Sequence, residues 1–294
     1  MCYNGYMELI ILQFFETIRS DIATLLACLF SLFGETLFLV VLICLIYWIV
    51  DKKLGERLVL TSFSSMPVNG GIKSAVSRPR PYVGGGVTRV EVDNPLISTV
   101  ELAPYESFPS GHSQMSAGLF FSSALHIRKK WGWILFPLLT LGVMLSRLYF
   151  GVHYPTDVLV GAAMGIAFAF FWDWMYQKHQ SKIYLVFALF ALLSIGLAFL
   201  FPNKSQIELC ACAVATAICL PLENKFIKFE NTTSFKKKLL RALIGIGCVG
   251  LVYGTFSFLP FEFLEELSWK FIKYFLTVST ATLIVPYLFK KLKI

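Results

Sequence analysis

Nine long apolar segments decide what this chain can fold into. They cover about residues 35–50, 56–73, 110–127, 131–149, 155–177, 182–201, 206–222, 239–259 and 269–289. The hydrocarbon core of a bilayer is about 30 Å thick, and roughly 20 helical residues cross it. The sequence therefore predicts an all-α fold, a polytopic bundle of about nine transmembrane helices.

The composition supports a membrane environment. Hydrophobic residues make up 56% of the chain and charged residues 15%, whereas a soluble domain usually carries about 25% charged residues. The net charge of +8 does not indicate nucleic acid, because the basic residues stand in short runs between apolar segments. The seven cysteines show no metal-like spacing, and most lie inside apolar segments. We expect an integral membrane protein with no nucleic-acid partner.

The N-terminal part differs from the other segments. Residues 7–20 set acids and Arg19 against Leu, Ile and Phe, which is typical of a helix in the membrane interface. The short first span starts either after Gly34-Glu35 or, across that interruption, nearer Ile22. No signal peptide is evident, so we expect the spans themselves to direct insertion. We divide the chain into an interfacial segment (1–34), a core (35–177) and additional transmembrane helices (178–294).

Loop charges predict the orientation. One set of alternate loops holds 17 of the 26 Lys and Arg residues. These loops follow the spans that end near residues 50, 127, 177, 222 and 289. By the positive-inside rule, that set is cytoplasmic. The remaining loops are then extracytoplasmic, including the longest, residues 82–108. This loop is either a flexible connector or a lid over a site, because loops of this length are often functional.

Three cations stand near the ends of apolar segments on the extracytoplasmic side: Lys73, Arg80 and Arg147. Arg pairs two phosphate oxygens through its planar fork, and Lys adds a compact charge. The alternative is that they only anchor helix ends at the lipid headgroups. Arg78-Pro79 precedes Arg80-Pro81, so spacing alone leaves open which Arg binds phosphate.

Ser110-Gly111-His112 opens an apolar segment, directly after Pro109. Ser is a good N-cap, and the free N–H groups of a helix start bind anions. Gly111 lets the backbone approach a phosphate, and His112 is placed to donate a proton to a leaving oxygen. Taken alone, the same residues also fit a simple loop-to-helix junction with a buried histidine.

His153 and Asp157 are four residues apart, which places them on one helical face. The carboxylate can then accept from one imidazole nitrogen and leave the other as a nucleophile. The alternative is a structural His–Asp cap. No carboxylates are spaced as metal ligands, and three protein cations supply the charge that Mg²⁺ would bring. We therefore expect a metal-independent reaction with no cofactor.

These motifs resemble a known family. Lys73-x6-Arg80-Pro81, Pro109-Ser110-Gly111-His112 and Ser146-Arg147-x5-His153-x3-Asp157 are similar to the three-part signature of the type 2 phosphatidic acid phosphatase superfamily, which also includes acid phosphatases and haloperoxidases. The resemblance covers about residues 50–177 and implies a six-helix phosphatase-type core, which the additional C-terminal spans extend. It implies His153 as the nucleophile that forms a phospho-histidine, Asp157 as its orienting residue and His112 as the acid.

The resemblance also assigns phosphate binding. By position, Lys73, Arg80, Ser110, Gly111 and Arg147 would bind it, which favours Arg80 over Arg78. The expected function is a phosphatase for lipid phosphates or pyrophosphates, with undecaprenyl pyrophosphate or phosphatidate-like substrates first. The site would face outward from a bacterial cytoplasmic membrane. A lipid phosphotransferase with the same site is one alternative, and a non-catalytic lipid carrier is another; the intact His153–Asp157 pair argues against the carrier.

Overall fold

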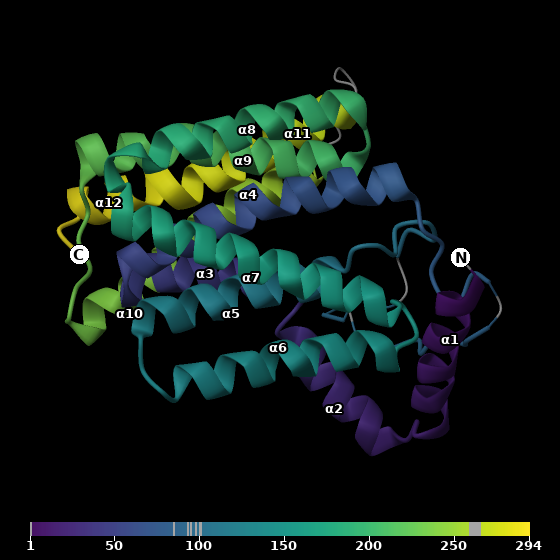
Figure 1. The fold of residues 1–294 in the computed structure, drawn as a ribbon. Helices are drawn as coiled ribbons and strands as arrows, with labels where there is room; N and C mark the ends of the chain where they lie inside the picture. The colour runs from purple at the N-terminus through teal and green to yellow at the C-terminus, as the bar shows by residue number, and fades with distance from the viewer. Residues whose placement is uncertain are drawn as a thin grey trace. The chain divides into compact units, whose positions relative to one another are not determined.

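The computed structural model describes residues 2–84, 86–92, 94, 96–97, 99, 102–258 and 266–294. The regular elements within these ranges are helical, with no strand among them. The α-helices are α1 (Cys2–Thr17), α2 (Asp21–Leu32), α3 (Thr36–Leu45), α4 (Lys52–Val76), α5 (Gly111–Ile127), α6 (Gly132–Tyr149), α7 (Pro155–Lys178), α8 (Ile183–Leu200), α9 (Lys204–Leu222), α10 (Phe235–Phe258), α11 (Glu266–Ser279) and α12 (Val285–Lys291) (Figure 1). The predicted all-α class is confirmed.

Local chemistry explains where several helices begin and end. Ser20 and Asn203 cap α2 and α9, each accepting from a backbone N–H three residues on. Pro155 begins α7, where its missing N–H costs nothing. Arg128, in the left-handed region at φ 54°, ends α5. The predicted interruption near Gly34-Glu35 is the break between α2 and α3.

Six helical segments of the described chain are long and apolar enough to cross a membrane. They are Gly132–Tyr149, Pro155–Lys178, Gln180–Leu200, Lys204–Ile227, Phe235–Phe258 and Glu266–Lys291. The pair α2 and α3 makes a seventh if it counts as one bent span. Helices α4 and α5 also lie at predicted spans, but α4 carries many buried polar residues and α5 has 17 residues. The total of nine crossings therefore stays a prediction.

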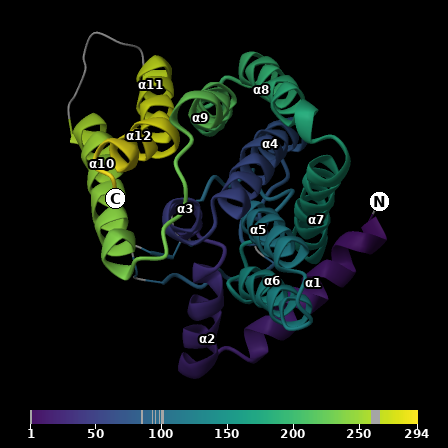
Figure 2. The ribbon, with the colours of Figure 1, turned by 90° about the vertical axis from the view of Figure 1, so that its left-hand side faces the viewer.

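The chain forms two compact units, residues 1–40 with 72–171, and residues 41–71 with 172–294. In the first unit α5 lies beside α6, and α2 packs on α6 (Figure 2). Gly142 permits that second contact, because a Cβ there would lie 2.2 Å from the ring of Phe30. Tyr149, Phe150 and Val152 form a buried cluster just beyond the end of α6.

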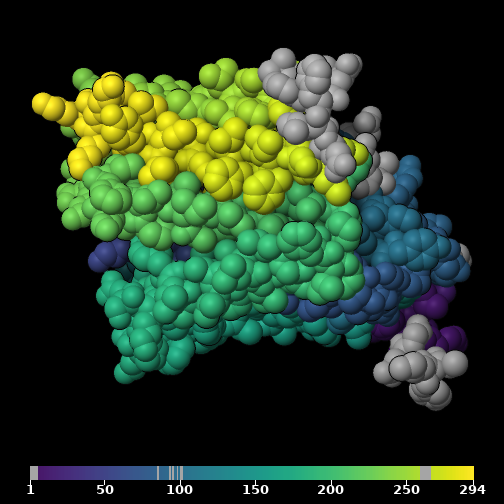
Figure 3. All heavy atoms as spheres, turned by 90° about the horizontal axis from the view of Figure 1, so that it is seen from above, coloured from purple at the N-terminus to yellow at the C-terminus, as the bar shows by residue number. Residues whose placement is uncertain are grey.

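In the second unit α9 packs against both α8 and α11. Figure 3 shows these helices side by side, from yellow α11 through green α9 to blue-green α8. A π-helical segment, Thr280–Ile284, joins α11 to α12, and its Ala281 carbonyl accepts from the Trp48 indole at 2.9 Å. The division of the chain at residues 34 and 177 stays a prediction from sequence.

The structure describes the predicted interfacial helix and part of the long loop. Residues 7–20 are helical as far as Thr17, within α1, while their place in the membrane interface stays a prediction. In the loop 82–108, residues 85, 93, 95, 98, 100 and 101 lie outside the described residues. Its described part packs on the start of the α6–α7 connection, since Val90 N–H donates to the Phe150 carbonyl at 3.0 Å. Whether the loop acts as a lid stays open.

Candidate active site

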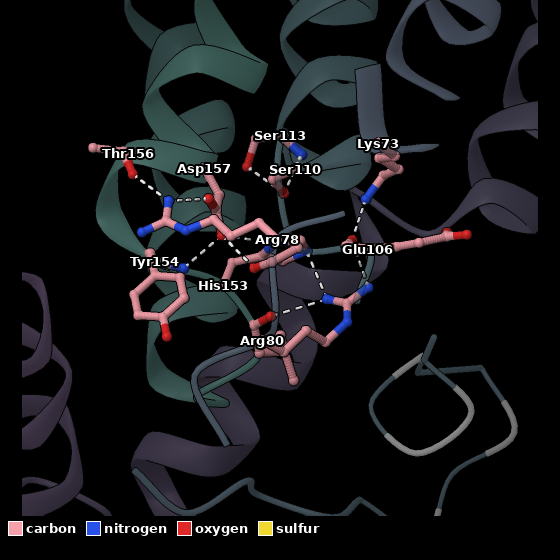
Figure 4. A network of polar contacts seen from close by, with 12 residues as sticks. Lys73, Arg78, Arg80, Glu106, Ser110, Ser113, His153, Tyr154, Thr156 and Asp157 are labelled. Atoms are coloured by element: carbon pink, nitrogen blue, oxygen red, sulfur yellow. Dashed lines mark hydrogen bonds and ion pairs between the residues drawn. The ribbon is translucent and has the colours of Figure 1, made fainter. Parts of the chain in front are cut away.

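All of the predicted site residues lie in the unit of residues 1–40 and 72–171. Four helix ends and two loops supply them. Lys73 lies in the last turn of α4, and Arg80 follows in the loop. Ser110 caps α5, and Gly111 and His112 start it. Arg147 lies in the last turn of α6, His153 between α6 and α7, and Asp157 in the first turn of α7. Figure 4 shows how several of these side chains turn toward one another. The spacing of the motifs therefore corresponds to a single place in this unit.

His153 stands between a cation and a carboxylate. Its Nε2 lies 3.2 Å from Arg80 Nη1, and its Nδ1 lies 3.5 Å from Asp157 Oδ2 (Figure 4). Guanidinium groups only donate, so Nε2 must be the unprotonated nitrogen when it meets Arg80. The imidazole proton then sits on Nδ1, on the side of Asp157. This tautomer directs the Nε2 lone pair toward Arg80.

The surroundings of His153 keep its ring neutral. The side chain is 3% exposed, and burial lowers its pKa well below the usual 6.5. The charges of Arg80, Lys73 and Arg147 act in the same direction. A neutral imidazole retains the lone pair that attack on phosphorus requires.

Several donors hold Asp157 in place. Its Oδ2 accepts from Ser107 Oγ and from the Tyr154 N–H at 2.8 Å. Its Oδ1 accepts from Arg78 Nη1 at 2.7 Å. The carboxylate is fully buried, and these contacts hold it on the Nδ1 side of His153. Asp157 thus lies beside His153, but not on a shared helical face as expected, because His153 precedes the start of α7 at Pro155. Its orienting role stays a prediction.

The contacts of Arg78 and Arg80 separate the two candidates for phosphate binding. Arg78 is paired with two carboxylates, Asp157 and Glu8, the latter at 2.6 Å. Arg80 instead donates to main-chain carbonyls, among them Ala103 at 2.8 Å and Glu106 at 3.1 Å. No carboxylate forms an ion pair with Arg80 within the described ranges, and the charges of Asp157 and Glu106 act on it only from farther away.

Lys73 shares that environment. Its Nζ donates to the same Glu106 carbonyl at 2.5 Å, next to Arg80 (Figure 4). A buried Arg80 and a half-buried Lys73, both held by neutral oxygens, form an anion site more readily than cations already paired with carboxylates. The geometry therefore favours Arg80 over Arg78 for phosphate, in agreement with the sequence resemblance.

Ser110 begins α5 at the same site. Its backbone N–H donates to the Asp157 main-chain carbonyl at 3.0 Å, and its Oγ accepts from Ser113 N–H at 3.4 Å. Helix α7 approaches closely, because a Cβ at Gly161 would lie 2.4 Å from the Ser110 carbonyl. The N-terminus of α5 is thus fixed against α7, with its dipole available for negative charge.

The sequence reading missed Glu35, which lies at the break between α2 and α3. Its Oε1 is 3.1 Å from His112 Nε2 and 3.7 Å from Arg147 Nη1. Arg147 Nη1 also donates to Ser31 Oγ at 2.8 Å. A lone carboxylate inside an apolar stretch is the signal that would have found it, since such residues are costly to bury. Glu8 and Ser107, which position Arg78 and Asp157, gave no comparable pattern.

The described residues also bear on metal binding. No group of three or more His, Cys, Asp or Glu side chains gathers as a metal site in the parts of the chain that the structure describes. The metal-independent reaction expected from the sequence stays a prediction, for experiment to decide.

Two family profiles match the chain. The family profile described as the PAP2 superfamily matches residues 55–181. A second profile, described as the transmembrane extension of PAP2 superfamily phosphatases, matches residues 207–294. No solved structure matches the chain.

Three curated relatives are similar over part of the chain. The bacitracin transport permease protein BcrC of Bacillus licheniformis is 44% identical over 24% of this chain and 34% of its own. The decaprenylphosphoryl-5-phosphoribose phosphatase of Mycobacterium tuberculosis is 36% identical over 32% of this chain and 45% of its own. The undecaprenyl-diphosphatase of Sulfolobus acidocaldarius is 30% identical over 39% of this chain and 51% of its own. The chain thus spans between about a third and a half of the length of these relatives.

Proposed function

Because the chain belongs to the PAP2 superfamily, we propose that this integral membrane protein is a phosphatase that hydrolyses a lipid phosphate or pyrophosphate. The observation that carries the proposal is the placement of His153 between Arg80, 3.2 Å from its Nε2, and Asp157, 3.5 Å from its Nδ1. A protein that only binds lipid phosphates needs cations but no such nucleophile. The carrier alternative is therefore not favoured.

In the proposed first step, His153 Nε2 attacks phosphorus. The bond between phosphorus and the leaving oxygen breaks as the P–N bond forms, and His112 gives a proton to that oxygen. Lys73, Arg80 and Arg147 stabilise the charge that spreads over the phosphoryl oxygens. Ser110 and Gly111, at the start of α5, contribute backbone N–H groups to the same oxygens.

In the second step, water attacks the phospho-histidine. The P–N bond breaks, one proton of the water passes to His112, and inorganic phosphate leaves. Asp157 stabilises the positive charge that His153 carries while it is phosphorylated. The cycle restores neutral His153 and protonated His112, so no further reactant is needed.

The lipid nature of the substrate rests on the membrane helices and on the relatives. Two relatives carry names that specify a polyprenyl phosphate compound. This supports undecaprenyl pyrophosphate or a phosphatidate-like lipid as the substrate class. The loop charges support a site on the extracytoplasmic face of a bacterial cytoplasmic membrane.

The proposal is tested by phosphate release in detergent from a panel of lipid phosphates, with and without EDTA. We expect activity with EDTA present, and a loss on the order of 10³-fold or more in His153→Ala. His126→Ala is the matched control, because His126 lies in the last turn of α5, at the end of the helix that is predicted to be cytoplasmic. A His153→Ala variant that retains activity would contradict the nucleophile, and loss of activity with EDTA would contradict metal independence.

A further inference from the structure

We propose that Glu35 is the positioning residue of the acid His112, which it holds by one nitrogen so that the other protonates the leaving oxygen. The inference rests on the proposed phosphatase function and adds a residue that lies outside the three motifs. Glu35 precedes α3 and is 6% exposed, so its carboxylate is buried beside the site.

Packing brings Glu35 to His112. The preceding residue is Gly34, where a Cβ would lie 3.2 Å from both Cβ and Cδ2 of His112, and 2.7 Å from Val143 Cγ1. The backbone at the α2–α3 break therefore lies directly against the first turn of α5. This contact places the next side chain along the imidazole edge.

The interatomic distances indicate which nitrogen of His112 faces Glu35. His112 Nε2 is buried without a hydrogen bond of good geometry among the described residues, and Glu35 Oε1 lies within ion-pair distance of it, at 3.1 Å. An ionised carboxylate only accepts, so Nε2 must carry a proton toward Glu35. Nδ1 is then the nitrogen available to the leaving oxygen. Carboxylate–histidine contacts of this kind fix the ring and its tautomer.

The site thus contains two histidine–carboxylate pairs that differ in their charged neighbours. In the pair of His153 and Asp157, Arg80 faces the second nitrogen and keeps it unprotonated. In the pair of His112 and Glu35, the charged neighbours are Glu35 itself, Arg147 from α6 and, farther away, Arg80. The carboxylate makes direct contact, and it offsets the repulsion between these cations and a protonated ring.

The proton balance is complete with this arrangement. As the bond between phosphorus and the leaving oxygen breaks, the Nδ1 proton of the imidazolium moves to the oxygen. The ring becomes neutral and keeps its Nε2 proton on Glu35. In the second step a proton from the attacking water returns to Nδ1. Glu35 neither gains nor loses a proton.

A leaving-group comparison tests this role. An alkoxide leaving group needs a proton, whereas 4-nitrophenolate leaves without one. We measure kcat/KM for dioleoyl phosphatidate and for 4-nitrophenyl phosphate, because kcat/KM reports the step that forms the phospho-histidine. For Glu35→Gln we expect kcat/KM to fall about 10²-fold with phosphatidate and less than about 3-fold with the nitrophenyl ester. Glu35→Asp is expected to recover part of the phosphatidate rate.

Glu8→Gln is the matched control, since Glu8 is also a buried carboxylate of this unit but pairs with Arg78. Any loss in this variant should be equal for the two substrates. Equal losses for both substrates in Glu35→Gln, or no loss, would overturn the role of Glu35 while leaving the phosphatase intact. A wild-type protein that releases phosphate from neither substrate would instead overturn the proposed function.

Discussion

At the scale of single residues, the two site histidines meet opposite electrostatic surroundings. His153 Nε2 faces the guanidinium of Arg80, while His112 Nε2 faces the carboxylate of Glu35. One ring is therefore kept neutral, and the other has a carboxylate beside it to pair with when it is protonated. A site that needs both a nucleophile and an acid at the same pH requires this kind of separation.

A titration of His153 tests that separation. Burial and Arg80 lower its pKa, so we expect its midpoint well below 6.5 in the folded protein. As the pH falls, the unfolded chain binds this proton at a higher pH than the folded protein does. The free energy of unfolding therefore decreases as the pH drops below about 6.5. The measurement is the histidine Cε1–H NMR signal in detergent micelles, assigned with single His→Gln variants because the chain has four histidines.

Arg80→Gln provides the comparison for this titration. Removing the guanidinium should move the His153 midpoint upward toward 6.5, since a nearby positive charge no longer opposes protonation. Glu16→Gln, on α1, should leave the midpoint unchanged. A wild-type midpoint at or above 6.5 would contradict the neutral nucleophile.

At the scale of helices, close packing of α7 on α5 holds the turn that is predicted to bind phosphate. Cβ atoms at Gly161 and Gly165 would lie 2.4 Å from the Ser110 carbonyl and 2.1 Å from the Gln114 carbonyl. Backbone atoms cannot move aside as a flexible side chain does. Glycine at these positions therefore sets the distance between the two helices.

Gly161→Ala should separate α7 from α5 and displace Ser110. We expect a lower thermal unfolding midpoint in detergent together with at least a 10-fold loss of kcat/KM, since a misplacement of about 1 Å can cost about 10²-fold. The control is Gly196→Ala in α8, where nothing lies within 4 Å of the added Cβ. Alanine there should be neutral or stabilising, by up to about 1 kcal/mol. An unchanged unfolding midpoint and kcat/KM in Gly161→Ala would show that α7 accommodates the Cβ without displacing Ser110.

The helices and the motif positions followed from sequence because each has a local signal. Apolar length predicted the helices, and the four-residue spacing predicted the contact of His153 with Asp157. Glu35 and Glu8 were missed as partners, because the contacts of α1 and of the α2–α3 break with the site depend on tertiary packing across 70 residues or more. The contrast between Arg78 and Arg80 was likewise invisible, since it depends on which acceptors each meets in space.

At the scale of the whole molecule, the chain continues well beyond the three motifs, with further helices and a second family match. The second profile covers residues 207–294, which include most of α9 and all of α10 to α12. The described helices there are apolar enough to cross a membrane. The extension carries none of the predicted site residues. If it serves lipid access, changes in it should alter KM more than kcat.

Orientation is the property of the whole molecule that loop charge alone predicts. Tyr105 lies in the loop before α5 and is 56% exposed, whereas Lys129 lies exposed in the loop that follows α5. In a variant without its seven cysteines, we introduce Tyr105→Cys or Lys129→Cys and treat intact cells with a membrane-impermeant maleimide. The positive-inside rule predicts labelling at position 105 in intact cells, and at position 129 only after permeabilisation. The reverse pattern would place the candidate site on the cytoplasmic side, where it would meet lipid phosphates of the inner leaflet instead.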